Sequence, residues 1–291
     1  MGGGEWTAEA YSTYTKSYRG MDATTYSTST VGAQEVFRLR SLDAMLNPYK
    51  VIRECADSAE HPKTFPVILA LDVTGSMGPT AAKVAKSLGI IMSDLYADDS
   101  IQDIEFCVMA IGDLYCDRAP VQMSQFESDV RIAEQLDKIW FEGGGGANKW
   151  ESYTAVWYMG ARHCKLDCWG RGGKGVIITI GDEQINPVLQ KDYITKYIGD
   201  SMQADIETAD LYAEAKEKFD IFHISVDDAE NSYRRNNRSP AGILDDSWQS
   251  VIGQNYRVST LNGLAKTITD IVIESYSGDA VSTFASDGIS W

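Results

Sequence analysis

Three short segments of the chain gather oxygen-bearing side chains or glycines directly after apolar runs. The first is DVTGSM, which contains Asp72, Thr74 and Ser76 and follows the run FPVILAL. Asp72, Thr74 and Ser76 stand at every second position, and this spacing places one carboxylate and two hydroxyls on the same side of a turn. These are hard oxygen donors of the kind that suit Mg²⁺ or Mn²⁺. We therefore expect this segment to form part of a divalent-cation site.

The second segment is EGGGGANKWES, residues 142–152. Its glycines allow the backbone to approach a neighbour closely, because they lack a Cβ atom. Its side-chain oxygens come from Asn148, Glu151 and Ser152. We expect this loop to face the first one.

The third segment is Gly181-Asp182-Glu183, which directly follows the apolar run VIITI. It adds one more carboxylate, Asp182, to the expected donor set. Asp113 also ends an apolar run, and we expect it to hold a water or a loop behind the ligands, although a plain strand-ending turn is the simpler explanation.

The elements that must position these loops alternate between strands and helices. Continuous apolar runs are typical of strands covered on both faces, and apolar residues every three or four positions are typical of helices. This alternation predicts a mostly parallel sheet that binds ligands beyond the carboxyl ends of its strands, where the strand order reverses. We expect strands at 65–71, 104–111, 176–180, 221–226 and 256–258, and helices from Pro79 onward, at 128–140, 151–164, 208–219, 245–252 and 261–276.

The two ends of the chain lack this alternation of strands and helices. Residues 1–32 are rich in Ser, Thr and Tyr without periodicity, which predicts an extended or disordered arm. The apolar content rises over residues 33–64, which predicts a lead-in segment packed on a neighbouring domain. We therefore expect one domain at 65–276 and a tail at 277–291.

The charge balance limits the classes of partner. The 291 residues carry a formal net charge of −16, which opposes binding to nucleic acid and to anionic membranes. No apolar stretch is long enough for a membrane-spanning helix or a signal peptide, so we expect a cytoplasmic protein. The excess of acidic side chains favours cations as ligands.

At these residues the chain resembles the von Willebrand factor A domain family, of the intracellular bacterial or phage type. The family's metal-ion-dependent adhesion site reads Asp-x-Ser-x-Ser, then a Thr, then an Asp. Asp72, Thr74 and Ser76 match the first element, with a Thr in place of the first Ser, and Asp182 matches the last. The resemblance covers about residues 65–276.

The middle element departs from the family pattern. No Thr follows the glycine run until Thr154, which we expect inside a helix. Asn148 is the expected substitute, and Ser152 is the second choice. Glu151, Ser152 and Asp113 are the residues expected to support the ligands from behind.

The resemblance implies a three-layer, Rossmann-like α/β fold and a site for Mg²⁺ or Mn²⁺. It also implies an interaction module rather than an enzyme, with a partner protein that presents an Asp or Glu to the ion. Intracellular members work beside AAA+ ATPases or within multi-subunit assemblies, so such a partner is expected here.

One alternative is enzymatic. The sequence Asp-x-Thr-Gly-Ser also resembles the nucleophile loop of haloacid-dehalogenase-like phosphotransferases, in which Asp72 would accept the phosphoryl group. The soluble phosphatases of that class carry a second Asp two residues after the nucleophile, where this chain has Thr74. The adhesion-site interpretation is therefore preferred.

Overall fold

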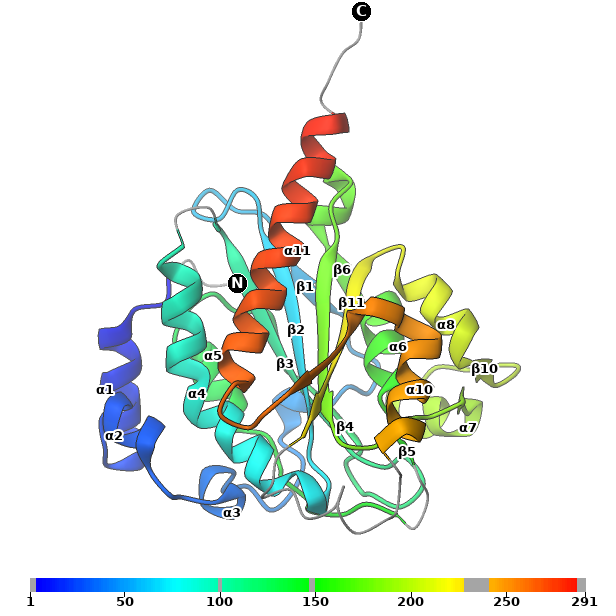
Figure 1. Ribbon diagram of the computed structural model, residues 1–291, viewed down its shortest axis with the longest axis horizontal. Coiled ribbons are helices and arrows are strands. Elements are labelled where there is room, and N and C mark those ends of the chain that lie inside the picture. The colour runs from blue at the N-terminus through cyan, green and yellow to red at the C-terminus, as the bar shows by residue number, and fades with distance from the viewer. Residues whose placement is uncertain (1–3, 99–100, 147–149, 228–240, 287–291) are drawn as a thin grey trace, which may run out of the picture.

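The computed structural model describes residues 4–98, 101–146, 150–227 and 241–286 (Figure 1). A six-stranded sheet crosses its centre in the order β12-β11-β7-β2-β3-β4. All strand pairs in this sheet are parallel except β3 with β4. The strands are β2 (Phe65–Asp72), β3 (Ile104–Ile111), β4 (Val121–Met123), β7 (Gly175–Gly181), β11 (Phe219–Val226) and β12 (Tyr256–Ser259).

The sheet register aligns the ends of the central strands. Asp72 pairs with Ile111 of β3, and Leu71 pairs with Ile180 of β7. The loops that follow β2, β3 and β7 therefore leave from one edge of the sheet. The chain moves from β2 outward to β3 and then returns to β7 on the other side of β2, so the strand order reverses here, as expected for a ligand-binding edge.

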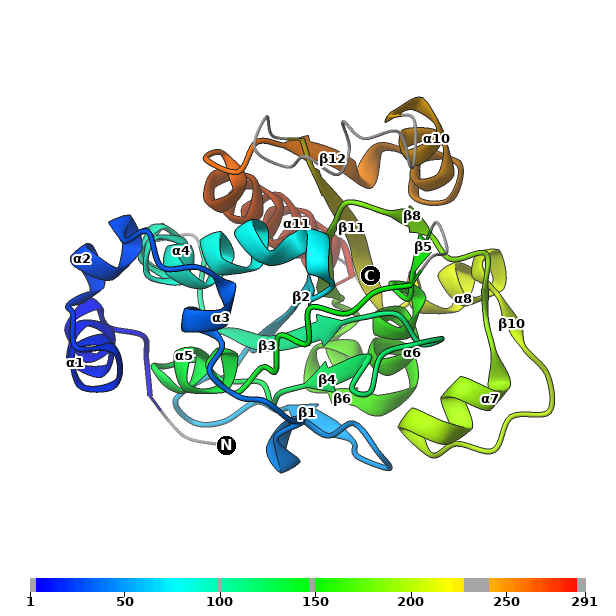
Figure 2. The same cartoon turned by 90° about the horizontal axis from the view of Figure 1, so that it is seen from below.

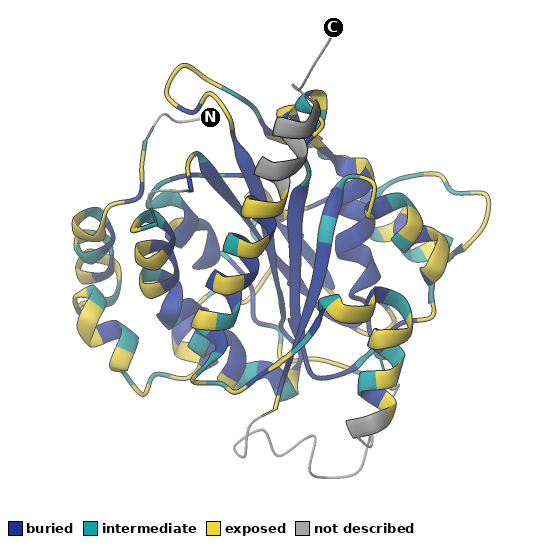
Figure 3. Ribbon diagram, turned by 45° about the horizontal axis from the view of Figure 1, so that its top comes forward, coloured by how far each residue is buried: buried dark blue, intermediate teal, exposed yellow. Residues whose placement is uncertain are grey.

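Helices cover both faces of the sheet (Figures 1 and 3), and this explains why its strands are continuously apolar. Val67 and Leu69 of β2 face one hydrophobic core, whereas Ile68 and Ala70 face the other. The first core is closed by α4 (Gly78–Tyr96), α5 (Arg131–Leu136) and α11 (Leu264–Ser286), and the second by α6 (Thr154–His163), α8 (Thr208–Ala215) and α10 (Ala241–Ile252).

The three-layer α/β architecture agrees with the sequence-based prediction, but several element bounds differ. The helix expected at 128–140 is only α5, and the helix expected from residue 151 begins at Thr154. A short strand, β5 (Trp150–Glu151), precedes that helix and pairs with β8 (Gln184–Ile185). The last helix continues to Ser286, so the described part of the expected tail is helical.

The expectation of an extended or disordered arm at residues 1–32 is wrong for the described residues. They form α1 (Ala8–Arg19) and α2 (Ala23–Thr28), which are followed by α3 (Ala33–Val36). The side chains of Thr7 and Asp22 cap the first two helices by accepting backbone N–H bonds. Buried aromatic rings then anchor the segment to the first core, namely Trp6, Tyr11, Tyr26 and Phe37.

Smaller elements complete the described chain. Strand β1 (Arg53–Cys55) pairs with β6 (Cys164–Leu166), and β9 (Val188–Leu189) pairs with β10 (Ile206–Glu207). The remaining helices are short: η1 (Ala44–Leu46), η2 (Gly75–Met77), η3 (Asp167–Arg171), α7 (Lys191–Tyr193), the π-helical η4 (Ile194–Ile198) and η5 (Gly253–Asn255). Within the described part of the chain, no helix combines the length and the apolar character needed to cross a membrane.

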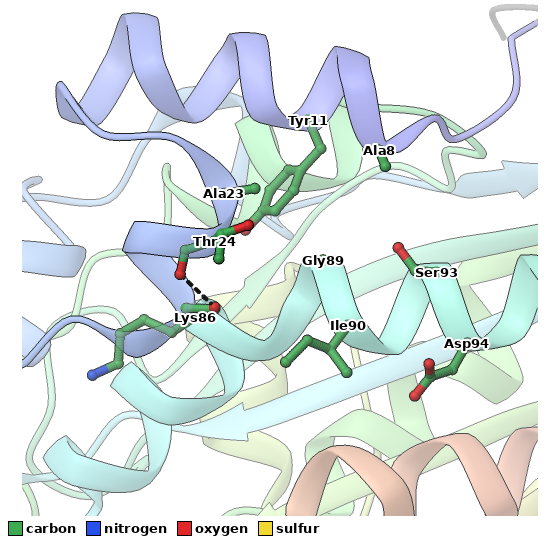
Figure 4. Close-up of a pocket in the computed structure, with 10 residues that line it drawn as sticks. Ala8, Tyr11, Ala23, Thr24, Lys86, Gly89, Ile90, Ser93 and Asp94 are labelled. Atoms are coloured by element: carbon green, nitrogen blue, oxygen red, sulfur yellow. Dashed lines mark hydrogen bonds between the residues drawn. The ribbon is translucent and has the colours of Figure 1, made fainter.

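A surface pocket of about 380 Å³ lies between the N-terminal helices and α4 (Figure 4). Tyr11 of α1 reaches toward Gly89 of α4, and Ile90 lines the same pocket. Lys86, another lining residue, fastens the chain after α2 by donating from Nζ to the carbonyl oxygen of Ser29 at 2.9 Å. The pocket lies where the N-terminal helices α1 and α2 pack on α4, and none of the candidate site residues lines it.

Candidate metal centre

Asp72 ends β2 and is completely buried. Its Oδ1 accepts bonds from the Thr74 backbone N–H at 2.8 Å and from the Thr74 hydroxyl at 2.6 Å. Its Oδ2 accepts a bond from the Tyr153 hydroxyl at 2.8 Å. The Asp-x-Thr spacing folds the loop back on the carboxylate in this way, because an Asp side chain readily bonds the backbone two residues on.

Ser76 connects the first loop to the third. Its hydroxyl donates to Oδ1 of Asp182 at 3.2 Å, across 106 residues of sequence. The structure thus brings together four of the five residues predicted as ligands, namely Asp72, Thr74, Ser76 and Asp182. The fifth, Asn148, lies outside the described residues.

The glycine loop lies directly over the first loop. The Gly75 N–H donates to the Gly144 carbonyl at 2.9 Å, and the Gly143 N–H donates to the Val73 carbonyl at 3.1 Å. A Cβ atom at Gly144 would lie 2.0 Å from Oδ1 of Asp117. The glycines predicted to allow a close backbone approach therefore do so here.

Glu151 reaches the same edge because β5 pairs with β8, just after Asp182. It is 5% exposed, and its Oε2 has no hydrogen-bond partner among the described residues. Burial, together with the smaller effect of the nearby carboxylates of Asp72, Asp113 and Asp117, raises the pKa of Glu151 to about 11. This group therefore holds a proton or needs a cation beside it.

The pKa of Asp72 is also raised above its ordinary value. Burial and, to a smaller extent, the charge of Asp182 raise the pKa of Asp72 to about 7, although the bonds from Thr74 and Tyr153 act in the opposite direction. The strongest charge effects on both Asp72 and Glu151 come from other carboxylates. A cluster of this kind favours a positive ion, which would reduce the repulsion.

The residues expected behind the ligands hold the β3–β4 turn. Oδ1 of Asp113 accepts from the Tyr115 N–H at 2.8 Å, and the Ser152 hydroxyl accepts from the Leu114 N–H at 3.0 Å. Asp117 accepts from the Asp113 N–H at 2.8 Å and from the Gly145 N–H at 3.0 Å, and so ties this turn to the glycine loop. Asp117 has no motif of its own and is not among the residues predicted from the sequence.

Thr154 lies in α6, as expected from its position after the glycine run. Its hydroxyl accepts a bond from the side-chain amide of Asn186, and its backbone N–H donates to the same side chain. The hydroxyl and the backbone N–H of Thr154 are thus both engaged by Asn186. Thr154 does not supply the missing Thr of the family pattern.

The donor set fits a divalent cation bound mainly through hydroxyls and water. In the described ranges, no three His, Cys, Asp or Glu side chains are arranged to hold a metal ion by themselves. The donors at this edge are instead two hydroxyls, of Thr74 and Ser76, beside the carboxylates of Asp72 and Asp182. Hydroxyl and carboxylate oxygens are the donor types that Mg²⁺ and Mn²⁺ accept.

The chain is similar to solved structures of low sequence identity. The pilus adhesin SpaC from Lactobacillus rhamnosus GG, in its open conformation, matches with a TM-score of 0.53 and 11% identity, over 75% of this chain and 30% of the adhesin. The vWF domain of the type V pili tip protein Mfa5 from Porphyromonas gingivalis matches with a TM-score of 0.47 and 9% identity, over 74% of this chain and 96% of that domain.

No protein-family model matches the sequence, and no curated protein matches it. At 11% identity, the likeness to the adhesin shows a common fold and nothing about activity. That fold has a mostly parallel six-stranded sheet with helices on both faces. The chain therefore has the three-layer, Rossmann-like α/β fold that the resemblance to the von Willebrand factor A family implies.

Proposed function

We propose that this chain is a protein-interaction module that binds a partner's carboxylate through a divalent cation, Mg²⁺ or Mn²⁺. The proposed ligands are Asp72, Thr74, Ser76 and Asp182, together with Asn148, whose role remains a prediction from the sequence. One observation carries the proposal. Two hydroxyls and several buried carboxylates converge where the strand order reverses, and one of those carboxylates, Glu151, has an oxygen without a partner among the described residues.

The donor types explain why a partner would be recognised. If the neutral hydroxyls of Thr74 and Ser76 bind the cation directly and the carboxylates of Asp72 and Asp182 act largely through water, the positive charge of the cation is incompletely neutralised. An incoming Asp or Glu side chain can replace a water there and gain strong charge-assisted contacts. The Tyr153 hydroxyl and the Thr74 N–H keep Asp72 oriented toward the first loop. Binding is therefore expected to require both the cation and an acidic residue on the partner.

The nature of the partner remains a proposal of the same kind. We expect a protein that presents an Asp or Glu, such as an AAA+ ATPase or a subunit of a larger assembly in the cytoplasm. The net charge of −16 disfavours nucleic acid and membrane surfaces as partners. The phosphotransferase alternative gains no support from the solved structures with this fold, which include a pilus adhesin.

The test is a titration of the full chain with Mg²⁺ and with Mn²⁺ by isothermal calorimetry. Ser76→Ala removes one proposed ligand without changing any charge, and we expect the affinity for the cation to fall about tenfold or more. Ser93→Ala, on the surface of α4, is the matched control and is expected to bind like the parent protein. Equal affinities in Ser76→Ala and in the control would contradict the proposed site.

A second measurement addresses the partner. Tagged protein is used to recover partners in Mg²⁺ and in a chelator, and the recovered proteins are compared by mass spectrometry. The proposal expects partners that are lost in the chelator and also lost with Ser76→Ala. Recovery that is the same in all three conditions would contradict a cation-dependent interaction.

A further inference from the structure

The carboxylate of Glu151 lies close to the first loop of the candidate metal centre. A Cβ atom added at Gly145 would lie 3.3 Å from Cβ of Thr74 and 3.7 Å from Oε1 of Glu151. The two side chains therefore flank the same small space. Among the charged groups that raise the pKa of Glu151, Asp72 has the largest effect. The Glu151 carboxylate is thus a neighbour of two proposed ligands, Thr74 and Asp72.

The backbone of Glu151 lies beside the third loop. Strand β5 pairs in parallel with β8, so that Trp150 lies opposite Gln184 and Glu151 lies opposite Ile185. Strand β8 begins two residues after Asp182. Figure 2, which views the molecule from below, shows β5 beside β8. Glu151 is therefore held between the two loops that supply the other proposed ligands of the described chain.

The neighbouring side-chain oxygens are already bonded within the fold. The Ser152 hydroxyl accepts from the Leu114 N–H at 3.0 Å, and the Thr154 hydroxyl accepts from the side-chain amide of Asn186. Oε2 of Glu151 is different, because it is buried and has no hydrogen-bond partner among the residues that the structure describes. Ser152 was the second choice for the middle ligand, but its hydroxyl supports the β3–β4 turn instead.

A buried carboxylate oxygen without a donor is unfavourable unless a proton or a cation lies beside it. The largest charge effects on the pKa of Glu151 all come from other carboxylates, which makes the ionised form less favourable still. A divalent cation between Glu151 and the first loop would remove this repulsion and satisfy the oxygen. Carboxylate oxygens are also ligands that Mg²⁺ and Mn²⁺ accept readily.

We propose that Glu151 binds the divalent cation directly, at the position that the family pattern gives to a Thr. The proposal rests on the cation site of the proposed function, but it requires no partner. A carboxylate in place of a hydroxyl cancels one of the two positive charges of the ion. The site would therefore hold the cation tightly before any partner arrives, and the remaining charge would still attract one carboxylate of the partner.

Calorimetric titration of the full chain with Mg²⁺ gives the first readout. Glu151→Gln keeps the size of the side chain and removes its charge, and we expect the affinity to fall about tenfold or more. Glu151→Asp keeps the charge but withdraws it by one methylene group, and it should also weaken binding. The matched control is Glu142→Gln, which removes a carboxylate of the same loop that is bonded to Arg118. We expect the control to stay within about threefold of the parent protein.

The number of waters on the ion separates a direct ligand from a residue that acts from behind. Tb³⁺ serves as the probe, because its luminescence lifetimes in H₂O and in D₂O give the number of bound waters. Loss of a direct carboxylate should add about one or two waters in Glu151→Gln, since a carboxylate binds through one or two oxygens. Glu142→Gln should add none. Thermal unfolding of the metal-free variants verifies that each one is folded.

The proposal is overturned if Glu151→Gln and Glu142→Gln weaken Mg²⁺ binding equally, or if the number of bound waters is unchanged in Glu151→Gln. Asn148→Ala tests the competing ligand. Waters gained in Asn148→Ala and not in Glu151→Gln would assign the middle position to Asn148. Failure of the cation site itself would look different, because Ser76→Ala would then bind like the parent protein, or the parent would bind neither ion.

Discussion

At the scale of single residues, the position of Asp72 depends on Gly181 as well as on its own loop. The Tyr153 hydroxyl that bonds Asp72 passes so close to β7 that a Cβ atom at Gly181 would lie 1.9 Å from it. The tyrosine ring is completely buried and packs edge to face on Trp248, so it has no free space to move into. Gly181 therefore serves the site by its lack of a side chain.

Gly181→Ala is expected to lower the free energy of unfolding by about 1–3 kcal/mol, because the added methyl group overpacks the site. It should also weaken Mg²⁺ binding, since Tyr153 can no longer hold Asp72. Gly170→Ala is the control, because a Cβ there meets no atom within 4 Å. Denaturant unfolding and calorimetry provide the two readouts. A Gly181→Ala protein as stable as the control would mean that Tyr153 can be displaced at little cost.

At the scale of elements, the N-terminal helices are attached to α4 through a close contact. Gly89 lies inside α4, where Ala would be favoured by about 1 kcal/mol. A Cβ at this position would lie 2.5 Å from the Tyr11 ring of α1. Arg19 of α1 also pairs with Asp137, and the Tyr14 hydroxyl donates to the same carboxylate at 2.8 Å. The close packing of Tyr11 on Gly89 and the buried Arg19–Asp137 pair thus attach α1 to the rest of the fold.

Gly89→Ala is expected to loosen α1 and α2 while leaving the sheet intact. Limited proteolysis should then cleave the first 30 or so residues several-fold faster, since undocked helices of this length are marginal by themselves. Gly170→Ala is again the control, because a Cβ there meets no atom within 4 Å. Unchanged proteolysis, with a higher melting temperature from the better helix former, would show that Tyr11 adapts.

The elements also show what the sequence could and could not predict. The strands and α4 were predictable, because buried parallel strands and amphipathic helices have distinct apolar patterns. The N-terminal helices were not, since Tyr and Thr form their buried faces and the apolar period is absent. Their signals were instead the caps, Thr7 and Asp22, and the C-terminal Gly20 with a φ of 77°.

The candidate site was predictable to a similar degree. Asp72, Thr74, Ser76 and Asp182 could be identified because each ends a strand or follows one closely, and parallel strands bring those ends together. Asp117 could not, because its role depends on the path of the β3–β4 turn and on Gly145. The raised pKa of Glu151 likewise could not be predicted, because the burial of this side chain depends on the pairing of β5 with β8. These strands are too short to leave a pattern in the sequence.

At the scale of the whole molecule, the buried carboxylates make stability depend on pH and on the cation together. In the metal-free protein, the pKa of Asp72 is about 7 in the folded state, compared with 3.8 for an ordinary Asp. The folded state therefore binds a proton more tightly than the unfolded state does. The resulting stabilisation is fully present below about pH 4 and is lost as the pH rises through about 7.

A cation competes with that proton, because only the ionised form of Asp72 attracts it. We expect Mg²⁺ to raise the melting temperature strongly at about pH 8, where the folded metal-free protein has lost the proton, and only weakly at about pH 5.5. Scanning calorimetry with and without Mg²⁺ measures this difference, and NaCl at equal ionic strength separates it from screening of the net charge. In Asp72→Asn the pH dependence of the Mg²⁺ effect should largely disappear. A Mg²⁺ effect that is equal at the two pH values, or unchanged in Asp72→Asn, would mean that the ion binds elsewhere on this acidic chain.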